Sequence, residues 1–303
     1  MPAQLGAMTL PFCGYPIEKA LDGLAEAGFR HVCLGLPHQH RFVPHPDDEE
    51  ARVHLLHDTC VRRSLEPIML ICLTHAEHEH GQQTWIKMVR HAATLEIPYV
   101  LGMGTWSFRD PHDLLAGVTS HAQQAEEEER WIAAMRPVCD EAVVLGINIV
   151  IKPHSGNTAT ALECRQLVQT FHHPALGICY DAGNVHFYQG VEPHHDLPLA
   201  AEYVRAMCLK DHIGPRFHTD FPPPGEGVVN HVALFQILKK AKFQGPMIIE
   251  RVDGAHDAGR MAYHDIVDRL KRARQHVIEA AAKAGLELEA TPPARLPPDR
   301  PRP

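Results

Sequence analysis

The sequence lacks any run of about 18 consecutive apolar residues, which is the length that a membrane-spanning helix requires. Its first residues, MPAQLGAMTLPF, also lack a basic segment followed by an apolar stretch, which is the pattern of a secretory signal. We therefore expect a cytoplasmic protein that neither crosses nor binds a membrane.

Clustered positive charge is missing as well. The chain has 29 Lys and Arg residues against 37 Asp and Glu residues, a formal net charge of −8 with histidine neutral. Contacts to nucleic-acid phosphates need grouped Lys and Arg side chains, and none stand out before the C-terminal tail. The sequence thus predicts a small-molecule partner and no nucleic acid.

Two further patterns are absent. The eight cysteines include no C-x-x-C pair and several lie in apolar runs, so we expect reduced core residues and no disulfides. No G-x-x-x-x-G-K-[ST] phosphate-binding loop occurs. The glycines of PPPGEGVV (222–229) indicate a tight turn in a flexible loop over the pocket.

Short apolar runs, by contrast, alternate with longer segments of helical period. The strand candidates are 5–10, 31–36, 67–72, 99–104, 148–152, 176–181, 204–210 and 246–250. Helical segments between them include 17–29, 47–65, 125–146, 158–171 and 231–243. Eight such units predict a single α/β domain, a (β/α)8 TIM barrel over residues 1–288. The remaining residues, 289–303, are rich in proline and charge and predict a disordered tail.

Active sites of such barrels lie at the carboxyl ends of the strands, so the last inward residue of each strand is the place to look. Four charged residues stand there: Lys152, Asp181, Lys210 and Glu250. A lysine at the end of a buried strand is costly without a negative partner, so we expect Lys152 to face Asp181 and Glu250. Lys210 shares strand parity with Cys208, and a thiol that fills core space is the simpler interpretation of Cys208.

The second half of the chain resembles the xylose isomerase-like barrels, a group that includes sugar-phosphate isomerases and epimerases, ketose 3-epimerases, inosose dehydratases and barrel-fold AP endonucleases. The resemblance rests on IVIKPHSG, CYDAGNVHFYQGVEP, CLKD, PPPGEGVVNHVALFQILKKAKFQG and PMIIE, taken in that order. Through the strand pattern it extends over residues 5–280.

The resemblance implies one divalent metal held by Glu, Asp, His and Glu. Asp181 and Glu250 match the second and fourth of these ligands, but Lys152 stands at the first position and Cys208 at the third. A protonated amine has no lone pair to offer a metal. It can, however, replace the ion, offsetting two carboxylates and donating a hydrogen bond to an enolate oxygen.

The identity of any cofactor stays open at this point. We prefer a site without metal. The alternative is a Mn, Mg or Zn ion that Asp181 and Glu250 bind together with His154 or His212. Lys152 is interpreted as an electrophile, a general acid or base, or an imine-forming amine, and a structural ion pair is the plainer alternative. Lys210 either binds a substrate oxyanion or pairs with Asp181 or Glu250.

Substrate contacts are predicted for His154, Asn184, His186 and His212. As metal ligands, His38, His75, His186 and His212 are weak candidates, and LPHQHRFVPH and THAEHEHG are more simply explained as histidine-rich surface loops. We expect Asp211 to orient Lys210.

Together these patterns predict a sugar or polyol isomerase, epimerase or dehydratase that abstracts a proton next to a carbonyl. One alternative is an inactive barrel that binds a sugar or serves as a partner subunit. A barrel-type AP endonuclease is a more distant alternative, because further His and Glu ligands and a basic face are missing. A homo-oligomer is left open.

Overall fold

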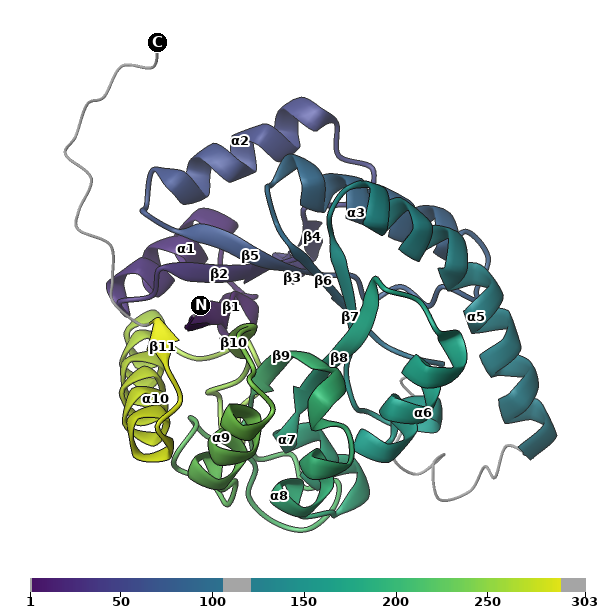
Figure 1. The fold of residues 1–303 in the computed structure, drawn as a ribbon. Helices are drawn as coiled ribbons and strands as arrows, with labels where there is room; N and C mark the ends of the chain where they lie inside the picture. Colours follow the sequence, from purple (N-terminus) through teal and green to yellow (C-terminus); the bar gives the residue numbers. More distant parts are fainter. Residues whose placement is uncertain (1, 106–120, 290–303) are drawn as a thin grey trace.

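In the computed structural model, which describes residues 2–105 and 121–289, eight parallel strands form a closed barrel (Figure 1). Each strand pairs with the next along the chain, and β10 pairs with β1 to close the ring. The barrel strands are β1 (Ala3–Met8), β2 (His31–Leu34), β5 (Glu66–Ile71), β6 (Tyr99–Gly102), β7 (Asn148–Ile151), β8 (Leu176–Asp181), β9 (Val204–Leu209) and β10 (Pro246–Ile249). The predicted TIM barrel is therefore confirmed.

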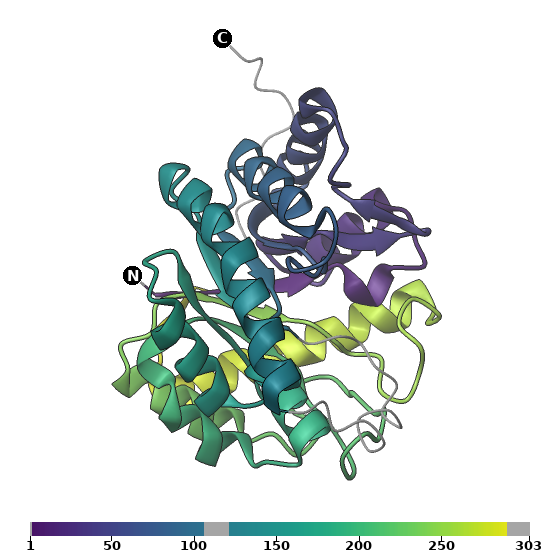
Figure 2. The same ribbon diagram turned by 90° about the vertical axis from the view of Figure 1, so that its right-hand side faces the viewer.

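Helices surround the barrel, as Figures 1 and 2 show. The longer ones are α1 (Ile17–Glu26), α2 (Glu50–Val61), α3 (Gly81–Thr94), α5 (His121–Val144), α6 (Ala161–Phe171), α9 (His231–Lys240) and α10 (Tyr263–Ala284). Two short helices follow β8 and its loop, α7 (Ala182–Asn184) and α8 (Pro193–Asp196). None of the helices in the described ranges has the length and apolar character needed to cross a membrane.

The predicted strand 31–36 is divided in the structure. Gly35 has φ of +94°, and a Cβ there would lie 2.2 Å from the carbonyl oxygen of Ile71. The chain turns at this glycine into a small antiparallel hairpin, β3 (Leu36–His38) and β4 (Arg41–Val43). Periodicity alone gave no sign of this hairpin, because it depends on one backbone conformation.

The C-terminal boundary of the barrel lies slightly beyond the predicted one. A ninth strand, β11 (Leu288–Glu289), pairs with β1, and Glu289 also forms an ion pair with Arg30. Glu289 is thus part of the barrel edge rather than of the predicted tail. The other residues of that tail, 290–303, lie outside the described residues.

The buried core has two parts, because alternate residues of each strand point to opposite faces. One set lies between the strands and the surrounding helices and includes Leu5, Ile149 and Met207. The other fills the barrel interior and includes Val150, Cys179 and Ile248. The inward parity of the second set continues to the carboxyl ends of the strands, which is what positions the site described next.

Candidate active site

The four predicted charged residues meet at the carboxyl ends of β7, β8, β9 and β10. Asp181 is the last residue of β8, and Lys152, Lys210 and Glu250 each directly follow a strand. Each of the four is two residues beyond an inward residue, namely Val150, Cys179, Cys208 and Ile248. The shared parity of neighbouring parallel strands therefore brings residues up to 98 positions apart into contact.

Two ammonium groups bridge two carboxylates in this cluster. Lys152 Nζ lies 2.6 Å from Glu250 Oε2 and 3.2 Å from Asp181 Oδ2. Lys210 Nζ lies 3.0 Å from Glu250 Oε1 and 3.3 Å from Asp181 Oδ2. The expected position of Lys152 between Asp181 and Glu250 is thus observed, and Lys210 completes a quartet with no net charge. We call these four residues the charged quartet.

Local backbone structure holds the quartet in place. Asp181 Oδ1 accepts a hydrogen bond of 2.9 Å from the backbone N–H of Asn184, so the same side chain caps α7. Gly183 lies against Lys210, and a Cβ at Gly183 would lie 2.7 Å from Lys210 Cγ. A glycine at this position therefore leaves the room that the Lys210 side chain occupies.

The quartet is buried, and burial and charge act in opposite directions on it. The side chains are between 0% and 9% exposed. Burial alone would lower the pKa of Lys152, but neighbouring Glu250 and Asp181 outweigh it and hold that pKa well above its usual value. Burial would likewise raise the pKa of Glu250, yet Lys152 and Lys210 hold it well below the usual range. Both groups are therefore charged at neutral pH.

Asp181 differs from Glu250 in this respect. Burial, together with the negative charge of Glu250, raises the pKa of Asp181 above its usual value, although Lys210 and Lys152 act to lower it. Asp181 is fully buried, and its Oδ2 takes ion-pair contacts from both lysines without a hydrogen bond among the described residues. Of the two carboxylates in the quartet, Asp181 is therefore the one whose charged form is stabilised less by its surroundings.

The divalent metal implied by the resemblance does not fit these residues. Asp181, Cys208 and Glu250 place ligand atoms within 4.8 Å of one another. However, Lys152 Nζ lies against both carboxylates, where an ion bound to them would have to sit. A dication about 4 Å from an ammonium would be repelled by roughly 8 kcal/mol at an effective dielectric constant of about 20.

Cys208 does not change that conclusion. Its thiol is fully buried, and its Sγ lies 3.6 Å from Cys179 Sγ. The contact with Cys179 together with burial raises the pKa of Cys208 well above its usual value, so the sulfur stays protonated. A neutral thiol that fills core space agrees with the prediction made for this residue.

A cavity of about 300 Å³ opens above the quartet, and its wall has two dissimilar sides. One side is polar and aromatic and comes from the second half of the chain. Its residues are Lys152, His154, Asn184, Phe187, Tyr188, Lys210, Thr219, Phe221, Glu250 and Arg251. Asp181 does not line the cavity, so Glu250 is the carboxylate of the quartet that reaches it.

The opposite side comes from the first half of the chain and is apolar. Apart from Gly102, it consists of Met8, Leu10, Leu36, Ile71, Leu73, Leu101 and Met103, which we call the apolar wall. Sequence reasoning had not selected these residues, although several occupy the same strand-end positions as the quartet. The inward parity that located Lys152 would also have located Met8, Ile71 and Met103.

His154 and Asn184 both line the cavity, as their predicted contact with substrate requires. Burial, reinforced by Lys152 and Lys210, lowers the pKa of His154 well below its usual value, so its imidazole is neutral. Its ring lies 5.5 Å from that of Tyr188. Asn184 Nδ2 donates a hydrogen bond of 2.8 Å to the carbonyl oxygen of Pro153.

His186 and His212 are placed differently. Neither is among the residues that line the cavity. Their Nδ1 atoms lie 2.7 Å apart, and the His212 ring packs against Phe187 and Phe221, which do line it. The predicted contact of these two histidines with substrate stays a prediction, and this position behind the aromatic side chains does not support it.

Asp211 does not orient Lys210, contrary to our expectation. Its carboxylate accepts four backbone hydrogen bonds, from the N–H groups of Gly225, Gly227, Val229 and His212. The distances are 2.9–3.0 Å. Asp211, two residues after the end of β9, therefore fixes the PPPGEGVV segment through these hydrogen bonds.

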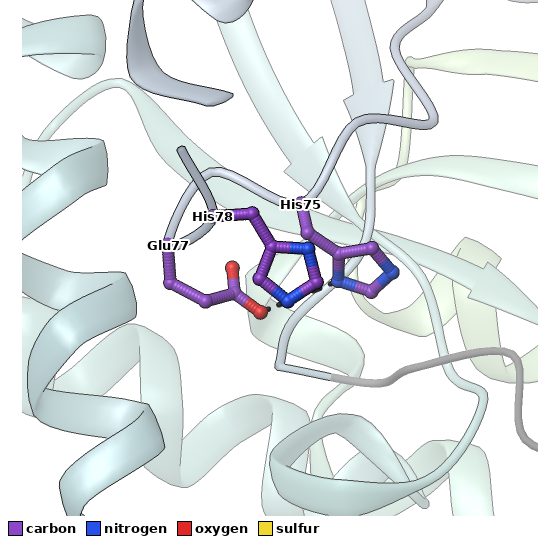
Figure 3. A group of neighbouring side chains, drawn as sticks. All are labelled: His75, Glu77 and His78. Carbon is purple, nitrogen blue, oxygen red and sulfur yellow. Dashed lines mark hydrogen bonds and ion pairs between the residues drawn. The ribbon is translucent and has the colours of Figure 1, made fainter. Parts of the chain in front are cut away.

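The weaker histidine candidates lie outside the cavity wall. His38 is buried, and its Nδ1 lies 3.0 Å from the carbonyl oxygen of Tyr15. His75 lies in the segment between β5 and α3 with Glu77 and His78 (Figure 3). His75 Nδ1 is 3.3 Å from Glu77 Oε1, and the rings of His75 and His78 are stacked with centroids 4.8 Å apart.

Fold and site together define a parallel (β/α)8 barrel with a buried charged cluster at its strand ends. The profile of the xylose isomerase-like TIM barrel family matches residues 21–288. The chain belongs to that family. No match was found among curated proteins.

Solved structures of the same architecture include several sugar epimerases. D-psicose 3-epimerase from Clostridium cellulolyticum H10 superposes with a TM-score of 0.73 at 13% identity, covering 92% of this chain and 99% of its own. A xylose isomerase domain protein from Planctomyces limnophilus superposes with a TM-score of 0.66 at 16% identity, covering 93% of this chain and 96% of its own. 3-keto-D-glucoside 4-epimerase from E. coli superposes with a TM-score of 0.66 at 15% identity, covering 89% of this chain and 99% of its own. At these identities the likeness shows the fold alone.

Proposed function

We propose that this protein moves a proton on the carbon next to the carbonyl of a small hydroxy-carbonyl compound, as an isomerase, epimerase or dehydratase. The observation that carries the proposal is the position of Lys152 Nζ, which bridges Glu250 and Asp181 at a wall of the cavity. The ammonium groups of Lys152 and Lys210 replace the metal that the family uses to polarise the carbonyl.

In this mechanism the C–H proton passes to Glu250, and the electron pair of that bond moves onto the carbonyl oxygen as an enolate. Lys152 and Lys210 donate hydrogen bonds to the developing oxyanion. As they turn toward the substrate, Glu250 loses part of the stabilisation that keeps its pKa low. Substrate binding therefore raises the basicity of the carboxylate that must accept the proton.

His154 supplies the second proton-moving group. Its neutral imidazole has one N–H group and one unprotonated nitrogen, and it lines the cavity beside Lys152. In an epimerisation its N–H donates a proton to the second face of the enolate while its other nitrogen takes up a proton from water, and Glu250 releases its proton to solvent. In a dehydration the same N–H protonates the departing hydroxyl, which leaves as water, and both side chains return to their starting protonation states by the same exchange with solvent. Lys152 itself is unsuited to form an imine, because its raised pKa keeps the amine protonated.

The test is solvent exchange in D2O, followed by NMR of the hydrogen next to the carbonyl over a panel of small hydroxy-ketones. Wild-type protein is expected to exchange at least one of them, and Lys152→Met to slow that exchange by about 100-fold or more, as the loss of one oxyanion donor does. Binding measured in parallel by ligand-observed NMR separates chemistry from recognition.

One observation favours the alternative of a binding barrel without turnover. Every charge of the quartet already has two opposite charges in contact, so the cluster is also a complete structural ion-pair network. This alternative predicts that ligands bind without exchange and that Lys152→Met leaves their binding unchanged. Loss of exchange together with retained binding in the variant, after exchange in wild type, contradicts it.

A further inference from the structure

The two sides of the cavity impose different demands on a ligand. A polyol places a hydroxyl on nearly every carbon, and each hydroxyl that leaves water needs a hydrogen-bond partner. The apolar wall consists of leucine, isoleucine and methionine side chains, which offer it none. Hydroxyls turned toward that side would therefore be buried without partners, whereas an alkyl or aryl group would bury apolar surface on both sides of the contact.

The charges around the cavity also limit the ligand. Lys152 and Lys210 are matched by Asp181 and Glu250, and Arg251 is matched by Asp253. Three cations thus face three anions in this part of the described chain. No net positive charge is left to offset a phosphate, which carries nearly two negative charges at neutral pH.

From this asymmetry, and resting on the proposed function, we propose that the substrate is an amphipathic hydroxy-carbonyl compound without phosphate. Its reacting carbonyl lies against Lys152 and Lys210, and an alkyl or aryl group at its other end packs on the apolar wall. The cavity of about 300 Å³ is at the small end of the range for ligand sites, so the ligand is compact.

Three hydroxymethyl ketones with equal numbers of non-hydrogen atoms test this idea: 2-hydroxyacetophenone, D-xylulose and dihydroxyacetone phosphate. Each is incubated with the full-length protein in D2O, and loss of the hydroxymethyl proton signal is followed by NMR. We expect at least tenfold faster exchange of 2-hydroxyacetophenone than of the other two. Leu101→Asn in the apolar wall is expected to reduce this preference at least tenfold, whereas Leu55→Asn, an equivalent change at an exposed site on α2, leaves it unaltered.

The outcomes separate the two claims. Exchange of D-xylulose or of the phosphate ester as fast as that of the aryl ketone overturns the substrate class but keeps the proposed chemistry. Binding of the aryl ketone alone, without exchange of any of the three, overturns the chemistry and supports recognition by the apolar wall. If Leu101→Asn fails to fold, the same change at Leu36 replaces it, and the wild-type comparison stands in either case.

A separate observation concerns the segment after β5. The Glu77 side chain is only 6% exposed, and its Oε2 has no hydrogen-bond partner among the described residues. A buried carboxylate oxygen without a partner is energetically costly, and a positive charge bound beside it would lower that cost. His75 and His78 lie beside it, and ligand atoms of the three residues are within 4.8 Å of one another (Figure 3).

We infer that His75, Glu77 and His78 bind a divalent ion of the zinc class, with water completing a four-coordinate shell. Two imidazoles and one carboxylate are a donor set that zinc and cobalt accept. The ion would supply the charge that Glu77 Oε2 lacks, and it would tie the segment after β5 to one conformation.

Cobalt titration of the metal-free, full-length protein tests this site, because four-coordinate Co²⁺ has intense visible absorption bands. One equivalent is expected to bind, with Glu77→Gln and His78→Ala each weakening binding at least tenfold. His194→Ala serves as the control, since that half-buried histidine also lies beside another, His195, with ring centroids 4.2 Å apart. Equal binding by wild type and the Glu77→Gln variant, or only six-coordinate spectra, would overturn the inference.

Discussion

Lys152 and Glu250 each hold the other in its charged form, and this mutual effect decides what either residue can do. With its pKa raised, Lys152 acts as a fixed cation and hydrogen-bond donor rather than as a nucleophile. In the proposed mechanism Glu250, with its pKa lowered, becomes an effective base only when a substrate draws the ammonium groups away. The reactivity of each residue thus depends on the other rather than on residue type.

A double-mutant cycle measures this dependence. Lys152→Met is expected to lower the free energy of unfolding by about 3 kcal/mol, because it leaves buried carboxylate charge without one of its two cations. Adding Glu250→Gln should recover part of that loss, since the unpaired charge is then removed. Chemical denaturation of wild type, both single variants and the double variant gives the interaction energy. Strictly additive single-variant effects would contradict the coupling.

Glu250 also predicts a pH dependence of stability. Its folded-state pKa lies well below its usual value of 4.5, so its ionisation stabilises the folded protein above that pH. The contribution is lost as pH falls from 4.5 through the folded-state pKa. The stability difference between wild type and Glu250→Gln should therefore be largest at neutral pH and shrink in acid, as measured by denaturation at several pH values. A difference that grows below pH 4.5 would reverse the assignment.

At the scale of elements, strand parity accounts for the site more than any single motif does. Four successive strands, β7 to β10, each place a charged side chain at the inward strand-end position. The strands β1, β5 and β6 place Met8, Ile71 and Met103 at corresponding positions. The contrast between a charged and an apolar half of the cavity therefore arises from which strands supply which residue type.

The loop after β9 depends on one side chain. Asp211 satisfies four backbone N–H groups around PPPGEGVV, and hydrogen bonds to a charged acceptor stabilise more than neutral ones do. Asp211→Ala is expected to cost about 2–4 kcal/mol of stability, in line with several such bonds lost together.

Hydrogen exchange provides the specific readout for Asp211. Protection of the Gly225, Gly227 and Val229 amides should fall in Asp211→Ala, whereas Glu226→Gln, which removes only an exposed ion pair with Arg272, should leave it unchanged. Unchanged protection in Asp211→Ala would show that the loop is held by other contacts.

At the scale of the whole molecule, the protein combines the barrel fold of its family with a different set of charged residues at the carboxyl ends of the strands. The fold is that of the xylose isomerase-like family. In the resemblance drawn from the sequence, Asp181 and Glu250 match the second and fourth metal ligands, whereas Lys152 and Cys208 stand at the first and third positions. Restoring one carboxylate should therefore restore the ability to bind an ion.

Lys152→Glu tests that expectation. We predict that this variant gains about one equivalent of Mn²⁺ or Zn²⁺ at the quartet, while the parent protein gains none there, as measured by elemental analysis after dialysis. Both proteins should carry His75→Ala and His78→Ala, so that the segment after β5 does not contribute. Stoichiometric metal in the parent protein would contradict the substitution of lysine for the ion.

The amino-acid sequence alone was enough to predict the barrel and the convergence of Lys152, Asp181, Lys210 and Glu250. Period and parity are local properties, and in a closed parallel barrel they fix which residues point inward at one end. Sequence also identified Lys152 and Cys208 as residues that depart from the ligand set implied by the resemblance.

Only the tertiary structure decided the remaining features. It showed that Lys210 joins Lys152 in contacting both carboxylates and that Asp211 binds a loop instead of Lys210. It also showed that His186 and His212 contact each other and are not among the residues that line the cavity. It also brought the apolar wall opposite the charges. Hydrogen-bond partners and cavity walls depend on side chains from distant segments meeting in space, and no local pattern in a single sequence encodes those distances.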